Sequence, residues 1–298
     1  MKLLFILIIA IFCFPFVSYS ANNAGAFIEK GIQARAAAMG MSQVSIAHNS
    51  DTVYWNPALM AFSSISEICL METNAYETQF FSLQGLFRIL NQPIGIALIN
   101  AYMNGIEETA LNTFSGRYDF TGNSLSYHAT ALYLGSSYQL LDLLSIGGTI
   151  KYLQESSTNY RAFGIGLDFG IAYLFKQQFM FGATVQNIIK PTMKRSLSAD
   201  PIDTVPTVIK LGASTAFFDD RLLTSFDLHV YYQRSLQANL GLEYRFNQSL
   251  SVRSGFNNDE FGLGVGLNLD SFILDFSWNN PRLFYLDDIY KISFAYQF

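Results

Sequence analysis

Charged residues are scarce in this chain of 298 residues: Asp, Glu, Lys and Arg together make up 14% of it, against about 25% in an ordinary soluble domain. Hydrophobic residues make up 50%. This composition does not suit a protein whose whole outer surface faces water. The aromatic share of 15% excludes the disordered and fibrous classes.

Long apolar runs are also missing beyond residue 20. A transmembrane helix needs about 20 consecutive apolar residues, but polar residues or glycines interrupt the later sequence at every second or third position. The one unbroken apolar stretch, residues 3–17, follows Lys2 and precedes the small residues Ser18 and Ser20. This pattern predicts a signal peptide of residues 1–20, cleaved after Ser20, and therefore export. A short N-terminal anchor helix is the alternative.

Cysteines and basic runs are rare as well. The sequence has 2 cysteines; Cys13 lies in the predicted signal peptide, so Cys69 alone remains and cannot form an intramolecular disulfide. The net charge is −5 and there is no run of Lys or Arg. We therefore expect no nucleic-acid partner.

What the sequence does have is a period of two. Alternate residues at the end of the chain fall on an apolar face (Tyr290, Ile292, Phe294, Tyr296 and Phe298) and on a second, mainly polar face (Lys291, Ser293, Ala295 and Gln297). The same alternation recurs in residues 163–171, 236–246 and 261–269. An exported chain of this kind can satisfy its backbone in lipid only as a closed β-barrel, with the apolar face outward and the polar face lining the lumen. A soluble β-sandwich is the alternative.

Turn residues divide the chain into about 14 strands, near 66–74, 78–87, 92–103, 124–138, 142–155, 159–175, 178–188, 206–218, 221–233, 236–246, 248–257, 260–269, 271–279 and 289–298. The long connections, 104–123, 189–205 and 280–288, all follow odd-numbered strands, and short ones follow even-numbered strands. Outer-membrane barrels have short periplasmic turns and long outer loops. The sequence thus predicts an all-β fold, a transmembrane antiparallel barrel over residues 63–298 in the cell outer membrane.

Residues 21–62 do not alternate. Residues 31–40 are rich in small side chains, and Asn56 before Pro57 is a favourable helix start, because the Asn side chain can cap the helix and Pro suits its first position. Tyr54 and Trp55 are poor residues for disorder. We expect an ordered segment here, with a disordered periplasmic tail as the alternative.

This segment resembles the N-terminus of a known family. Residues 34–40 (Ala-Arg-Ala-Ala-Ala-Met-Gly), the Asn/Asp-rich step that follows and residues 54–59 (Tyr-Trp-Asn-Pro-Ala-Leu) are similar to the PorV/PorQ family, which belongs to the FadL-like outer-membrane proteins. The resemblance covers residues 31–62. It implies that residues 21–62 form a hatch inside a 14-stranded barrel, with a motif of Arg35, Gly40, Asp51, Trp55, Asn56, Pro57 and Ala58. Phe298, with Tyr296, resembles the C-terminal signal that the barrel-insertion machinery reads.

Ten ionisable residues are expected to face the lumen: Lys151, Asp168, Lys210, Asp227, His229, Glu243, Arg245, Arg253, Asp275 and Lys291. If the hairpin at Asn247 pairs Phe246 with Leu250, Glu243 lies opposite Arg253 and forms an ion pair with it. These charges either tie the strands together and anchor the hatch through Arg35 and Asp51, or they mark a binding site.

Two functions compete on the resemblance. PorV/PorQ proteins imply secretion or surface attachment of exported proteins through a type IX system, with cargo or secretion components as partners; FadL-like channels imply passage of small hydrophobic molecules. Outer membrane lipid is a partner in both. The outer loops would supply the contacts, or part of an interfacial aromatic girdle, through Tyr102, Phe114, Tyr118, Lys190, Lys194 and Arg195.

An enzymatic function has little support in the sequence. Its three His residues, at positions 48, 128 and 229, lie in separate elements without metal-ligand spacing, and neither Gly-x-Ser-x-Gly nor His-Glu-x-x-His occurs. We expect no catalytic residue, metal or cofactor. An outer-membrane enzyme such as a phospholipase is the remaining alternative, and it would need a nucleophile and a base at the barrel rim.

Overall fold

The computed structural model describes residues 24–47, 49–158, 160–195, 203–231, 235–282 and 286–298. The predicted signal peptide therefore lies outside the described residues. Among those residues, none of the helices has both the length and the apolar character that a membrane span requires.

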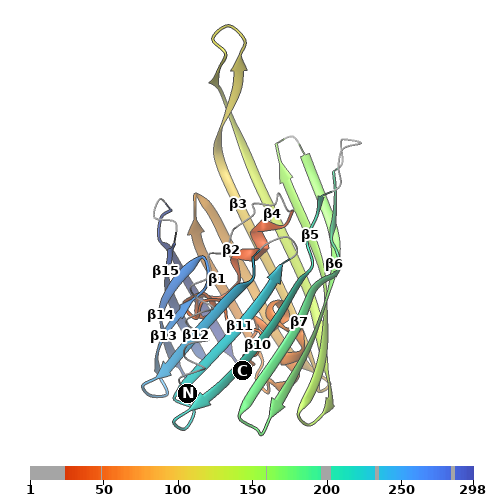
Figure 1. Ribbon diagram of the computed structural model, residues 1–298, viewed down its shortest axis with the longest axis vertical. Helices are drawn as coiled ribbons and strands as arrows, with labels where there is room; N and C mark the ends of the chain where they lie inside the picture. Colours follow the sequence, from red (N-terminus) through yellow and green to blue (C-terminus); the bar gives the residue numbers. More distant parts are fainter. Residues whose placement is uncertain (1–23, 48, 159, 196–202, 232–234, 283–285) are drawn as a thin grey trace.

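The fold is a closed antiparallel β-barrel of 14 strands, which confirms the predicted fold class (Figure 1). Its strands are β1 (Glu67–Ala75), β2 (Thr78–Ile89), β3 (Gln92–Asn112), β4 (Arg117–Leu141), β5 (Leu144–Ser157), β6 (Tyr160–Phe175), β7 (Phe179–Ile189), β10 (Val208–Phe217), β11 (Leu222–Tyr231), β12 (Gln237–Arg245), β13 (Leu250–Phe256), β14 (Glu260–Leu269), β15 (Phe272–Pro281) and β16 (Ile289–Gln297). Each strand pairs with the next, and the pairing of β1 with β16 closes the barrel. In the part of the chain that the structure describes, the barrel wall therefore has no open edge, as lipid requires.

Tight turns join the strands at one end of the barrel, the lower end in Figure 1. Leu90–Asn91 and Lys176–Gln177 have positive φ angles, the backbone conformation that two-residue hairpin turns need. These are connections after even-numbered strands of the barrel, which were predicted to be short. Phe298 lies at the same end.

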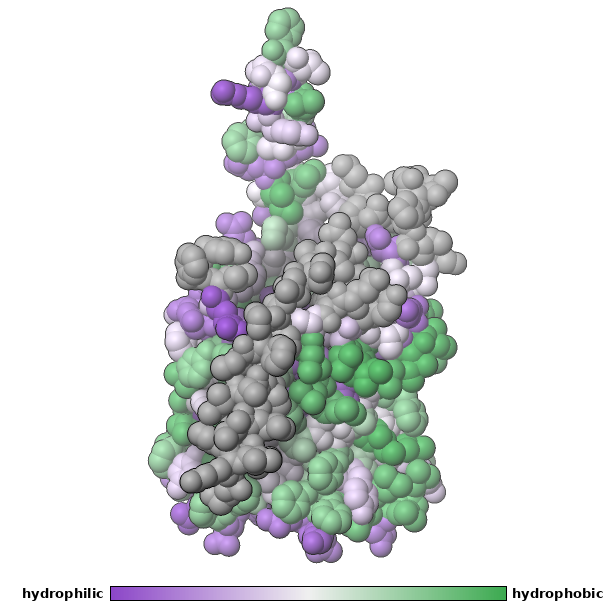
Figure 2. Space-filling model, viewed as in Figure 1, coloured by the Kyte–Doolittle hydropathy of each residue, from purple (hydrophilic) through white to green (hydrophobic). Residues whose placement is uncertain are grey.

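The two faces of the wall separate as the alternation predicts. On β16, Tyr290 and Ile292 are 55% and 50% exposed, whereas Lys291 and Ser293 are 4% and 3% exposed. Figure 2 shows large hydrophobic areas on the visible wall and hydrophilic atoms along the lower rim. This is the surface that lipid chains would contact.

The prediction that residues 104–123 form a loop is wrong. β3 and β4 continue through most of it and pair from Met103↔Tyr127 to Asn112↔Arg117, forming a hairpin that projects beyond the rest of the barrel (Figure 1). Two register shifts, between Met103 and Ile106 and between Glu107 and Thr109, change which residues share a face. These bulges and the glycines at 105, 116 and 122 hide the alternation in the sequence.

The predicted connection at 189–205 also contains short strands. β8 (Thr192–Arg195) pairs with β6, and β9 (Asp203–Thr204) pairs with β8. These two short strands extend the sheet beside β6 but are not part of the closed ring of strands.

Residues 24–47 and 49–62 form an inner segment in the lumen, which includes four short helical pieces: η1 (Ala26–Lys30), α2 (Ala34–Ala38), α3 (Thr52–Trp55) and η2 (Pro57–Phe62). The predicted helix start is confirmed, since Asn56 Oδ1 accepts a hydrogen bond from Ala58 N at 3.2 Å and Pro57 begins η2. Nearly all of this inner segment is buried. It therefore needs no alternating pattern, because every side of it faces protein.

Candidate functional site in the barrel lumen

Glycines on the inner wall make room for the inner segment. A Cβ atom at Gly182 would lie 1.9 Å from Val44 O, and one at Gly255 would lie 2.1 Å from Gly40 N. Gly40 itself has a φ of +61°, a conformation that favours glycine. The backbone of the inner segment thus packs directly on the backbone of the wall. The inner surface of the wall is complementary in shape to this segment.

A chain of buried ion pairs fastens the inner segment to the wall. Arg35 Nε lies 2.7 Å from Glu243 Oε2, and Arg253 Nε lies 2.6 Å from the same oxygen. Arg253 Nη1 in turn lies 2.6 Å from Asp275 Oδ1. The predicted pairing of Glu243 with Arg253 is confirmed. Arg245 also reaches Glu243, at 3.2 Å, but its side chain is 51% exposed at the barrel end.

Wall side chains also bind the backbone of the inner segment. Asn239 Nδ2 donates to Gly40 O at 2.7 Å, and Ser145 Oγ donates to Ala58 O at 2.7 Å. Asp227 Oδ2 accepts Val44 N at 2.9 Å, and Lys291 Nζ donates to Lys30 O at 2.8 Å. These bonds satisfy carbonyl and amide groups that the short helices leave free.

Asp51 is buried but has no described ion-pair partner within 4 Å, unlike the expected anchor. Burial raises the pKa of Asp51 to about 7, the nearby charge of Glu67 adds to this, and Arg35 opposes it. Glu67 is held by the neighbouring Ser50, whose N and Oγ donate to Glu67 Oε1 at 2.9 and 2.6 Å. Asp51 is therefore a buried carboxyl group of the inner segment whose charge depends on pH.

The other predicted inward charges lie on β5, β6, β10 and β11. Lys151 Nζ and Asp168 Oδ1 are 2.7 Å apart and both are buried. His229 Nε2 lies 3.7 Å from Asp227 Oδ2. Lys210 Nζ stands 4.9 Å above the Trp55 ring, a favourable cation–π distance.

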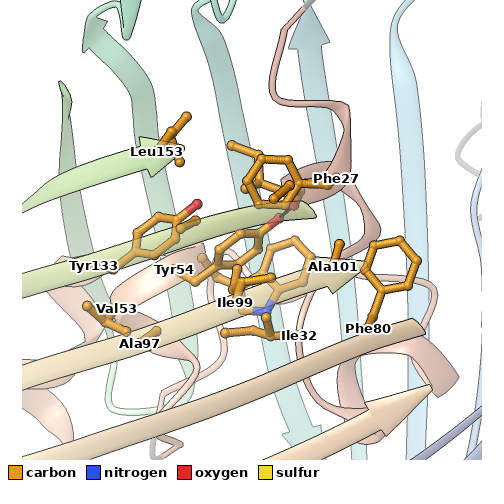
Figure 3. Close-up of a cluster of buried hydrophobic side chains, with 14 of the residues drawn as sticks. Phe27, Ile32, Val53, Tyr54, Phe80, Ala97, Ile99, Ala101, Tyr133 and Leu153 are labelled. Atoms are coloured by element: carbon orange, nitrogen blue, oxygen red, sulfur yellow. Dashed lines mark hydrogen bonds between the residues drawn. The ribbon is translucent and has the colours of Figure 1, made fainter. Parts of the chain in front are cut away.

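One side of the lumen is apolar. The inner faces of β3 and β4 present Ala97, Ile99, Ala101, Ala129 and Ala131, which are all at most 4% exposed. Figure 3 shows Phe27, Ile32, Val53 and Tyr54 of the inner segment packed among such side chains. The lumen therefore has two sides: an ionic one formed mainly by β10–β16, and an apolar one.

Aromatic rings of the inner segment lie beside this apolar wall. Tyr54 contacts Trp55 and Tyr133 edge-to-face, with ring centroids 4.7 and 5.7 Å apart. Tyr54 also donates a hydrogen bond from its hydroxyl to Ile28 O, drawn in Figure 3. Tyr54 and Trp55 thus join α3 to η1 and to the wall.

The apolar wall and Glu67 were not predicted as site residues. Residues 94–99 and 131–134 carry no charged or amide side chain on either face, and this loss of alternation was the available signal. For Glu67 the signal was weaker: it shares a face of its strand with Cys69 and Met71, opposite Ile68 and Leu70.

The remaining predicted positions are placed as follows. Tyr296 stacks on Phe298, with ring centroids 5.6 Å apart. Phe114 and Tyr118 lie at the tip of the β3–β4 hairpin and are exposed. Tyr102 stacks on His128 at the base of that hairpin, with ring centroids 6.2 Å apart. Lys190 follows β7, and the side chains of Lys194 and Arg195 lie outside the described residues.

Comparisons with known proteins identify the fold. No protein-family model matches the chain, and neither does any curated protein. Among solved structures, the toluene transporter TbuX of Ralstonia pickettii superposes with a TM-score of 0.68 at 15% identity, covering 91% of this chain and 99% of that one. The monoaromatic hydrocarbon channel CymD gives 0.68 at 13% identity, covering 92% and 99%. A Pseudomonas aeruginosa FadL homologue gives 0.59 at 11% identity, covering 95% and 99%. The chain has the fold of FadL-like outer-membrane barrels.

Proposed function

We propose that the protein is an outer-membrane channel for small hydrophobic molecules, with residues 24–62 as its hatch. The observation that carries this proposal is the apolar inner wall of β3 and β4, represented by Ala101 and Ala131. The lumen of a barrel is ordinarily polar. An apolar solute that leaves water for such a wall gains about 25 cal/mol for each Å² buried.

Two further observations support the proposal. Phe27 and Ile28 already pack against this wall, so its surface accepts hydrophobic groups in the resting state. The similar structures include a toluene transporter and a monoaromatic hydrocarbon channel. An outer-membrane location fits the predicted signal peptide, and recognition of Tyr296 and Phe298 by the insertion machinery belongs to the same proposal.

The test uses the fluorescence of Trp55. The chain has 2 Trp residues, so Trp278→Phe leaves Trp55, in the lumen, as the single reporter. Bromobenzene added to this protein in detergent should quench Trp55 saturably. Ala131→Asn places a polar amide on the apolar wall and should weaken this quenching at least fivefold.

Ala295→Asn is the matched control, since Ala295 is also buried on an inner face but follows Lys291 and Ser293 on β16. It should leave quenching unchanged. Linear, non-saturable quenching that is equal in all three proteins would exclude a hydrophobic site in the lumen.

Secretion or surface attachment of exported proteins is the second candidate. It is favoured by the PorV/PorQ resemblance of residues 31–62 and by the projecting β3–β4 hairpin, whose tip exposes Phe114 and Tyr118. Shortening this hairpin in cells should reduce the amount of exported protein at the cell surface and leave hydrocarbon uptake intact. Unchanged surface display would remove this candidate.

A further inference from the structure

The projecting part of the β3–β4 hairpin has two open edges. Within the described residues, β2 accompanies β3 only as far as Tyr102, and β5 accompanies β4 only as far as Tyr127. Beyond these points β3 and β4 pair with each other alone, up to Asn112↔Arg117. An open edge presents backbone N–H and C=O groups that can pair with another strand.

This two-stranded ribbon is held together by its own side chains. Asn112 Oδ1 accepts the backbone N–H of Phe114 at 2.9 Å, and Asn112 Nδ2 donates to Asp119 Oδ2 at 2.8 Å. Glu108 Oε2 accepts bonds from Thr121 Oγ1 at 2.7 Å and Asn123 Nδ2 at 2.8 Å. Isolated hairpins are marginally stable in water, so these contacts keep the edge extended and ready to pair.

One face of the ribbon is apolar. The register pairs Leu111 with Tyr118 and Thr109 with Phe120, and paired residues point to the same face. Leu111, Tyr118 and Phe120 are all more than half exposed. The hairpin projects away from the rest of the wall (Figure 1). Exposed apolar side chains in such a position indicate an interaction surface.

The ribbon is acidic. Residues 103–126 contain Glu107, Glu108 and Asp119 against a single basic residue, Arg117. Glu107 is exposed on β3. Edge-to-edge pairing with a second copy would bring like charges together, and anionic lipid headgroups would be repelled. A basic partner has the complementary charge.

From the open edge, the apolar face and the charge, we propose that β3 of the ribbon binds an extended, basic polypeptide segment as an added strand. Backbone bonds to residues 105–112 would supply affinity, and alternate side chains of the segment would supply specificity. Basic side chains of the segment would lie beside Glu107, and its apolar side chains would cover Leu111 and Tyr118. This proposal does not depend on the function of the lumen.

The test uses the full chain in lipid nanodiscs and a fluorescent ten-residue peptide with Lys residues in one half, to face Glu107, and Val residues in the other half, to face Leu111. Fluorescence anisotropy should show binding at least tenfold tighter than for the same peptide with Glu in place of Lys. Methylation of the peptide's alternate backbone nitrogens, which removes the edge hydrogen bonds, should weaken binding at least tenfold. Glu107→Lys should reverse the preference between the Lys and Glu peptides.

Two further variants complete the design. Glu77→Lys makes the same change in the β1–β2 turn, where Glu77 is exposed, and should leave the preference unaltered. Replacement of Leu111, Tyr118 and Phe120 by Ser should weaken peptide binding while leaving Glu107 in place. Equal binding of the methylated peptide would overturn strand addition. The proposal that the partner is basic would be overturned by either of two results. One is a peptide preference that Glu107→Lys does not change, and the other is self-association through the hairpin without peptide binding.

Discussion

At the scale of single residues, the lumen contains two kinds of carboxylate. Glu243 is buried between Arg35 and Arg253, and both guanidinium groups lie within 2.7 Å of its oxygens. Asp51 is buried without such a partner, and its pKa is raised to about 7. The first is held by ion pairs that include Arg35 of the inner segment, and the charge of the second depends on pH.

Glu243→Gln should destabilise the folded barrel by about 3 kcal/mol or more, because it removes the buried negative charge that Arg35 and Arg253 share. Urea unfolding in detergent, followed by the fluorescence of Trp55, measures the loss. Arg245→Gln is the matched control: its side chain is 51% exposed, so its removal should cost no more than about 1 kcal/mol. Equal losses of unfolding free energy in the two variants would show that the buried ion pairs of Glu243 do not hold the inner segment to the wall.

Asp51→Asn should flatten the dependence of stability on pH. The folded protein keeps the proton on Asp51 up to about pH 7, whereas the unfolded chain releases it near the ordinary value of 3.8. The folded state therefore loses stability through this group as pH rises from about 4 to 7, by at most about 4 kcal/mol at 1.36 kcal/mol per pKa unit. Urea unfolding of both proteins at pH 4, 5.5 and 7 tests this. An identical pH slope in the two proteins would show that another group is responsible.

At the scale of elements, the inner segment and the wall fit by close backbone contact. Gly182 and Gly255 on the wall leave no room for a Cβ atom beneath Val44 and Gly40. The inner segment is thus held by close packing as well as by ion pairs. We expect the close packing to tolerate substitution less well, since a packed backbone cannot rotate away as a side chain can.

Gly182→Ala should displace the hatch while leaving the barrel intact. The added Cβ would lie 1.9 Å from Val44 O, which is backbone and must move. Acrylamide quenching of Trp55 in the Trp278→Phe protein should rise. Gly148→Ala is the control, because its Cβ would lie on the outer face with Asp168 O at 3.6 Å; it should leave quenching unchanged. Equal quenching in both variants would show that Gly182 does not seat the hatch.

The sequence predicts these elements unevenly. β14 and β16 follow from strict alternation, and the pairing of Glu243 with Arg253 follows from the turn at Asn247 because hairpin register is local. The contact of Arg35 with Glu243 spans 208 residues, and no local rule relates them. The role of β3 and β4 was hidden for another reason: when both faces are apolar, alternation cannot tell lumen from lipid.

At the scale of the whole molecule, the low content of charged residues follows from where each type of side chain lies. Hydrophobic side chains cover the outer wall, and many of the charged side chains lie in the interior. Large hydrophobic side chains occupy the outer positions, as Leu263 and Phe276 do, while Arg253 and Asp275 of the same hairpins are buried inside. The charges that remain are therefore concentrated around the hatch and at the two ends.

The closed wall should make the protein resistant to dodecyl sulfate until it is heated. Among the described residues, each strand of the barrel wall is paired on both sides in a ring, so detergent has no edge within the wall at which to begin separating strands. The unheated protein should migrate faster in a gel than the boiled protein, and its circular dichroism should be dominated by strand. Migration unaffected by boiling, with a helical spectrum, would contradict the barrel.

The seam between β1 and β16 also encloses the inner segment. Residues 24–62 come before β1 in the chain, and β16 follows the other described strands of the barrel. Once these two strands pair, the wall is sealed around residues 24–62, and nothing of that size can pass through it. The inner segment is thus the content around which the wall closes. A barrel sealed without its hatch could be filled afterwards only through its mouth.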